Sequence, residues 1–91
     1  MKVKAHVIVT GRVQGVYFRG NTRKEAQKLN VNGWVQNLPD GRVEAIFEGE
    51  KDNVDKLIEI LRDGPSRANV TDLNLYWLDY NNEFNDFQIR Y

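Results

Sequence analysis

The segment from Gly11 to Arg19 joins an alternating apolar pattern to a helical one, and it contains two glycines and an arginine. Backbone N–H groups at a helix start have no intrahelical acceptor, and the helix dipole makes this end positive. Gly11 and Gly15 allow backbone conformations that other residues avoid, and the Arg19 guanidinium can donate to two oxygens of one anion. The segment therefore predicts an anion-binding loop that would fit a phosphate group. The alternative is an ordinary strand-to-helix turn with a surface arginine.

Asn37 is the second candidate, because it lies in a predicted strand although asparagine is disfavoured in strands. Its side-chain amide both accepts and donates hydrogen bonds, so it could hold a water molecule in a fixed orientation. The alternative is an asparagine at the strand end that prepares the turn at residues 38–41. The residues alone leave both interpretations open.

Several other kinds of site are excluded or disfavoured. The loop lacks the Gly-Lys-Ser/Thr ending of a nucleotide P-loop and the G-x-G-x-x-G pattern, so nucleotide binding is not indicated. The absence of cysteine excludes disulfides, zinc-thiolate sites and thiol nucleophiles. His6 is the only histidine, which excludes a multi-histidine metal site and disfavours a serine triad. We expect His6 to be a plain surface side chain on the less apolar face of its strand.

The charged residues near the loop allow two interpretations. Basic side chains gather around the loop and the helix that follows it, namely Arg12, Arg19, Arg23 and Lys24. They form either a solvated helix face or part of an anion site. The carboxylates of the predicted strands and helices are expected in water, among them Glu44, Glu48, Asp52 and Asp55. No apolar pocket is indicated that would raise the pKa of one of them for general acid catalysis.

The elements that must position these residues follow from the hydrophobic periodicity. Alternation predicts strands at residues 3–10, 34–38, 42–48, 70–78 and 87–91. Apolar spacings of three and four predict one helix from Phe18 to near Asn30 and another around residues 54–61, which ends at Gly64-Pro65. This order indicates an α+β, ferredoxin-like βαββαβ sandwich, in which two helices pack on one face of an antiparallel sheet of four to five strands. We expect residues 1–91 to form a single domain.

The composition limits the possible partners. The 91 residues include 13 basic and 13 acidic side chains, so the net charge is zero. No overall field favours nucleic acid or an anionic membrane, and any anion site must be local. No apolar run approaches membrane-spanning length, and the first residues lack the apolar core of a signal peptide. We therefore expect a soluble cytoplasmic protein.

Two stretches closely resemble the acylphosphatase family. The family pattern Gly-Arg-Val-Gln-Gly-Val-x-Phe-Arg is met at every fixed position from Gly11 to Arg19, with Tyr17 at the variable place. The second signature fits through Ala26, Leu29, Val31, Gly33-Trp34-Val35, Asn37, Asp40-Gly41, Val43 and Glu44. The length, the element order and the ending at residues 87–91 fit as well, so the resemblance covers essentially the whole chain.

The resemblance implies the hydrolysis of carboxyl-phosphate anhydrides to a carboxylate and inorganic phosphate, by a monomer with no metal, cofactor or covalent intermediate. Arg19 would bind the phosphate and Asn37 would position the attacking water. The backbone of Gln14, Gly15, Val16, Tyr17 and Phe18 would surround the phosphoryl oxygens. Inorganic phosphate should then inhibit competitively.

Two details of this reaction are hypotheses. Acyl phosphates are already activated, since a carboxylate leaves readily, so the protein mainly needs to orient water and stabilise phosphoryl charge. No side chain offers an obvious base at neutral pH, so the substrate's own phosphate oxygen would take the water's proton. The Tyr91 carboxylate would fold back to orient Arg19.

Two functions of other classes compete with this one. A ferredoxin-like RNA-binding module would use exposed aromatic residues on its sheet, but Tyr17 and Phe18 fall at a loop and helix start. A regulatory small-ligand module of the same fold is the third possibility. The sequence does not identify the physiological acyl group, because the predicted site binds only the phosphoryl end of the substrate.

Overall fold

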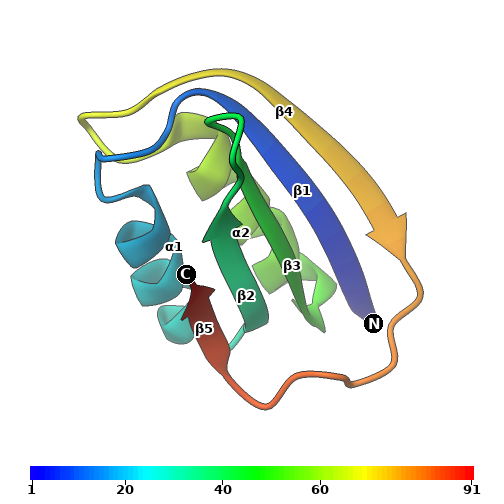
Figure 1. Ribbon diagram of the computed structural model, residues 1–91. Coiled ribbons are helices and arrows are strands. Elements are labelled where there is room, and N and C mark those ends of the chain that lie inside the picture. The colour runs from blue at the N-terminus through cyan, green and yellow to red at the C-terminus, as the bar shows by residue number, and fades with distance from the viewer.

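A computed structural model describes residues Met1 to Tyr91, which form one sheet and two helices (Figure 1). The elements in chain order are β1 (Lys2–Arg12), α1 (Phe18–Lys28), β2 (Asn32–Asn37), β3 (Val43–Glu50), α2 (Lys51–Asp63), β4 (Asn69–Leu78) and β5 (Phe87–Arg90). All elements expected from the periodicity are present, with bounds that agree to within a few residues. Neither helix is long and apolar enough to cross a membrane.

The sheet has the strand order β4-β1-β3-β2-β5. Its first four strands are antiparallel to their neighbours, which confirms the ferredoxin-like class. The fifth strand departs from the expected antiparallel arrangement, because β5 pairs in parallel with β2 and sets Ile89 opposite Val35. The reason is the connection after β4, which crosses one end of the sheet and enters the far edge in the direction of β2 (Figure 1).

The hydrophobic core lies between the sheet and the two helices. The alternation in β1 directs Ala5, Val7 and Val9 into this core, where each is at most 1% exposed. On the helix side, α2 packs against β1 and α1 packs against β2 and β5, and Leu57 of α2 and Phe18 of α1 are buried in this core. Apolar spacing in the two helices therefore produces the packed face that the sequence indicates.

The other face of the sheet is less open than the sequence suggests. Lys4 and Glu48 lie opposite each other on β1 and β3, and both are buried. The Lys4 ammonium pairs with the Glu83 carboxylate, and the Glu48 carboxylate accepts the Phe84 N–H at 2.9 Å. The expectation that Glu48 is solvated is wrong, because the segment after β4 folds over this end of the sheet.

His6 and Glu44 also differ from expectation. The His6 ring contacts the Glu44 carboxylate at 2.7 Å, and their side chains are only 25% and 19% exposed. The Gln36 amide donates to the second Glu44 oxygen at 2.8 Å. Burial of Glu44 raises its pKa, but the hydrogen bonds from His6 and Gln36, with the charges of His6 and Arg42, lower the pKa below its ordinary value. His6 is thus part of a polar cluster rather than a plain surface side chain.

Candidate active site

The loop between β1 and α1 has the unusual backbone that its glycines indicate. β1 pairs with β4 through a bulge between Thr10 and Gly11. Gly11 has φ +128°, and a Cβ there would lie 2.1 Å from the Asn69 carbonyl oxygen. Gly15 has φ +74°, and Tyr17 adopts a left-handed conformation (φ 65°, ψ 26°) immediately before α1. Such a conformation is uncommon for a residue other than glycine and is typical of functional loops.

The backbone N–H groups of this loop are unpaired. The first helical hydrogen bond of α1 runs from the Asn21 N–H to the Tyr17 carbonyl at 3.0 Å. None of the N–H groups from Gly15 to Gly20 donates to a backbone carbonyl, and no side chain caps the helix. These donors and the positive end of the helix dipole together favour an anion in front of the loop.

Arg19 brings a positive charge to the same place. Its Nη1 donates to the Arg90 carbonyl oxygen at 3.2 Å, and its guanidinium lies 4.8 Å from the centre of the Tyr91 ring. The Tyr91 carboxylate does not pair with it, and no other carboxylate lies within ion-pair distance of Arg19. The end of the chain therefore orients Arg19, but through a carbonyl and a ring rather than through a carboxylate. Its charge stays available to a ligand.

A pocket of about 250 Å³ joins the loop to Asn37. Its lining consists of Val13, Gly15, Tyr17, Phe18, Arg19, Gly20, Asn37, Ile89 and Tyr91. Of the predicted site residues, the pocket thus brings together Gly15, Tyr17, Phe18, Arg19 and Asn37. Gln14 and Val16 do not line it, since Val16 is buried in the core and the Gln14 side chain is bonded to the turn after β2. The other basic residues near the loop, Arg12, Arg23 and Lys24, are exposed and lie outside the lining.

Asn37 is the last residue of β2 and shares the helix-side face with Val35. Its Oδ1 is buried and accepts no hydrogen bond within the protein. The following turn is closed instead by Leu38, Asp40 and Arg42. The interpretation of Asn37 as a residue that prepares the turn is therefore unsupported. An amide with unmet hydrogen-bonding capacity at this pocket is suited to hold a water or a ligand oxygen.

The pocket offers few side chains that could take part in catalysis. Its lining contains no histidine and no aspartate or glutamate side chain, so no conventional general base faces the Asn37 amide. The positive charge and the free donors favour a dianion such as a phosphoryl group. Val13 and Phe18, which are buried, give the lining an apolar part.

Sequence reasoning did not assign Val13, Gly20 or Ile89 to the site. Ile89 reaches it because β5 lies beside β2, and alternation at residues 87–91 indicates a strand without indicating its neighbour. Gly20 touches the site through Tyr17, since a Cβ on Gly20 would lie 2.2 Å from the Tyr17 ring. Its place three residues after Tyr17, in the predicted first turn of the helix, is the available signal.

Comparisons of sequence and of structure with known proteins agree on one family. A family model described as Acylphosphatase matches residues 5–89. An acylphosphatase from Syntrophus aciditrophicus is 53% identical over 91 residues, which are 100% of this chain and 95% of that protein. The crystal structure of acylphosphatase from Bacillus subtilis superposes with a TM-score of 0.93 at 36% identity, covering 98% of this chain and 99% of that one. An acylphosphatase structure from Coxiella burnetii gives a TM-score of 0.92 at 40% identity, covering 98% and 93%.

Proposed function

Because the chain belongs to the acylphosphatase family and hydrolyses acyl phosphates to a carboxylate and inorganic phosphate, we propose that this reaction takes place in the pocket between the loop and Asn37. The observation that carries the proposal is the meeting of three groups in one pocket: the unpaired loop N–H donors, the Arg19 guanidinium, whose charge no carboxylate neutralises, and the Asn37 amide, whose oxygen has no partner.

The loop and Arg19 bind the phosphoryl group. Arg19 and the N–H groups from Gly15 to Phe18 donate to the phosphoryl oxygens, where charge gathers in the transition state. Gln14 and Val16 belong to the loop by their backbone only. Because Arg19 is already held by Arg90 and Tyr91, little side-chain freedom is lost when the substrate binds.

Asn37 orients the attacking water. The water bonds to the Asn37 amide and attacks phosphorus in line with the leaving acyl oxygen, which departs as a carboxylate. A phosphoryl oxygen of the substrate takes the proton of the water, so that the products are a carboxylate and dihydrogen phosphate. The lack of a histidine or carboxylate side chain in the lining supports this route.

The remaining features of the proposal come from the sequence. The substrate is a small-molecule acyl phosphate, and the reaction needs no metal or cofactor. Inorganic phosphate competes with the substrate, and the protein is a monomer of one domain, residues 1–91, that does not bind nucleic acid. A cytoplasmic location stays a prediction. Burial of Phe18, which is 2% exposed, argues against an RNA-binding role for this aromatic side chain.

The proposal is tested with purified protein and benzoyl phosphate in the presence of a chelator. We expect hydrolysis that the chelator leaves unchanged and that inorganic phosphate inhibits competitively. Activity that disappears with the chelator, or inhibition that raises no KM, would contradict it. Salt-dependent binding to single-stranded RNA without hydrolysis would support the RNA-binding module instead.

A further inference from the structure

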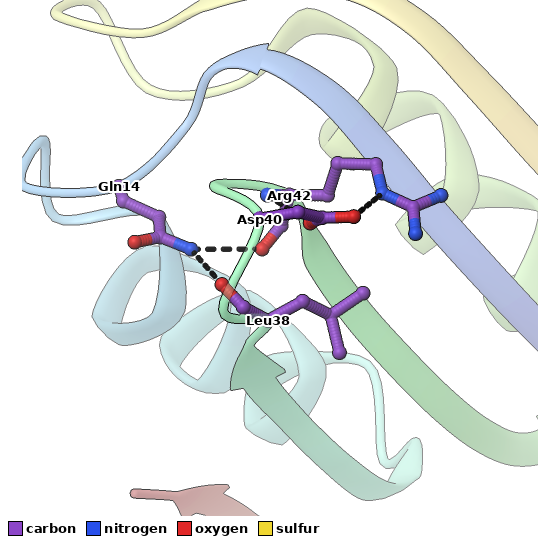
Figure 2. A network of polar contacts seen from close by, with 4 residues as sticks. All are labelled: Gln14, Leu38, Asp40 and Arg42. Atoms are coloured by element: carbon purple, nitrogen blue, oxygen red, sulfur yellow. Dashed lines mark hydrogen bonds and ion pairs between the residues drawn. The ribbon is translucent and has the colours of Figure 1, made fainter.

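Gln14 lies in the loop, but its side chain points to the turn between β2 and β3 (Figure 2). Its Nε2 donates to the Leu38 carbonyl at 2.8 Å and to the Arg42 carbonyl at 2.9 Å. Because both acceptors are carbonyl oxygens, the amide can meet them only through its NH2 group. Both donor positions of Nε2 are thus occupied, and the amide nitrogen is not free to bind a phosphoryl group.

The turn that receives these bonds is already rigid. The Leu38 N–H donates to the Arg42 carbonyl at 2.8 Å, and the Gly41 N–H donates to the Leu38 carbonyl at 3.1 Å. A carbonyl oxygen has two lone pairs, so Gln14 fills the second acceptor position of each. The Arg42 backbone N–H and guanidinium also bind the Asp40 carboxylate, at 3.1 and 2.8 Å, and hold the pKa of Asp40 below its ordinary value (Figure 2). Gln14 therefore links the loop to a unit that is fixed internally.

Asn37 depends on this unit for its position. It immediately precedes Leu38, and its own amide oxygen has no partner in the protein. No hydrogen bond of its own side chain holds the amide in place, so the backbone and packing must do so. Gln14 ties that backbone to the loop, because it bonds to Leu38 and Arg42, which lie 24 and 28 positions after it in the chain.

We propose that Gln14 is a positioning residue that holds Asn37 at a fixed distance from the phosphoryl-binding loop. The inference rests on the proposed roles of Asn37 and the loop. The two parts of Gln14 then have separate roles. Its backbone belongs to the loop, and its side chain aligns the end of β2, which carries Asn37, with the loop.

The expected effect is on turnover more than on binding. A displacement of about 1 Å in a group that orients a reactant can cost on the order of a hundredfold in rate. The phosphoryl donors come from the loop itself and from Arg19, which is held by Arg90 rather than by the turn. Loss of the Gln14 bonds should therefore lower kcat while phosphate still binds.

Gln14→Met removes the donors at nearly constant side-chain length. We expect kcat for benzoyl phosphate to fall by between about tenfold and a hundredfold, with the inhibition constant of phosphate changed by less than about threefold. The matched control is Gln36→Met, because Gln36 also donates through a half-buried Nε2, to Glu44 at 2.8 Å, but from the opposite face of β2. It should keep the wild-type kcat. Kinetics are normalised to the folded fraction, measured by phosphate titration.

Two further measurements separate positioning from a structural role. In the Asn37→Ala background, Gln14→Met should lower kcat by less than about threefold, since the group that it positions is already gone. The side-chain NH2 resonance of Asn37, followed by NMR, should shift or broaden in Gln14→Met and stay unchanged in Gln36→Met. Effects on kcat that multiply in the double variant, an unchanged Asn37 resonance, or a wild-type kcat in Gln14→Met would each overturn the proposal.

These results also distinguish the two proposals. If Asn37→Ala lowers kcat but Gln14→Met does not, the positioning role fails and the proposed active site stands. If Asn37→Ala itself turns over at the wild-type rate, the proposed role of Asn37 fails, and the positioning role of Gln14 fails with it.

Discussion

Arg19 combines a defined position with a charge that no carboxylate neutralises. The Arg90 carbonyl and the Tyr91 ring hold it from the side of β5, while the loop donors lie along its own chain segment. A guanidinium placed in this way can donate to two phosphoryl oxygens at once, which an ammonium group cannot do in the same fixed geometry.

Replacement of Arg19 should therefore weaken both binding and turnover. We expect Arg19→Ala to lose about 1.5–3 kcal/mol of transition-state stabilisation, because charge-assisted hydrogen bonds are lost. This loss lowers kcat/KM by roughly ten- to more than a hundredfold. Arg19→Lys should recover only part of this loss. Steady-state kinetics measure the effect, with Arg23→Ala as the control, since Arg23 is exposed on the same helix and outside the pocket. An Arg23 variant as impaired as the Arg19 variant would show that general positive charge matters rather than Arg19.

The single residues of the site differ in how far the sequence reveals them. The glycines, Arg19 and Asn37 form local patterns whose chemistry can be named from residue type and spacing. The side-chain bonds of Gln14 cannot be read in this way, because their acceptors are backbone carbonyls of a distant turn. The Arg90 carbonyl that holds Arg19 has the same property.

The strands present two chemically distinct faces. In β2, Asn37 lies on the helix side with Val35, whereas Gln36 lies on the other side and bonds to Glu44. The alternation of each strand was readable from the sequence. The burial of Lys4 and Glu48 was not, because it depends on a segment that returns from β4 across the sheet.

The cluster on this second face predicts a pH dependence of stability. The pKa of Glu44 is lower in the folded protein than its ordinary value of 4.5. The unfolded chain therefore takes up this proton first on acidification. The contribution of Glu44 to stability is full above pH 4.5 and is lost as the pH falls through the folded pKa.

We expect the difference in unfolding free energy between wild type and Glu44→Gln to shrink between pH 6 and pH 3, measured by urea denaturation. The kcat of Glu44→Gln at neutral pH should match wild type, since Glu44 does not line the pocket. A stability difference that is constant across this pH range would show that the ionised carboxylate is not the group that matters.

The molecule as a whole assembles its pocket from three separated regions of the chain. The loop follows β1, Asn37 ends β2, Ile89 lies in β5, and Tyr91 follows β5 directly. Periodicity predicted the strands, helices and fold class. It did not predict that β5 pairs in parallel with β2, because the pattern within a strand carries no information about its neighbour or direction.

Phosphate binding to this assembled pocket should stabilise the folded state. At ten times its dissociation constant, phosphate adds about 1.4 kcal/mol to the free energy of unfolding. For a domain of this size the melting temperature should then rise by roughly 5–10 °C. The comparison is made against potassium chloride at equal ionic strength. Arg19→Ala should lose most of the increase, and an equal increase in that variant would place the bound phosphate elsewhere.

The most direct measurement is the effect of Asn37→Ala on kcat and on phosphate inhibition, determined on the same preparation with benzoyl phosphate. Asn37 is proposed to orient water and not to hold the phosphoryl group. We therefore expect kcat to fall by about a hundredfold or more while the inhibition constant of phosphate stays close to that of wild type. A wild-type kcat, or a large rise in KM at constant kcat, would contradict the proposed active site.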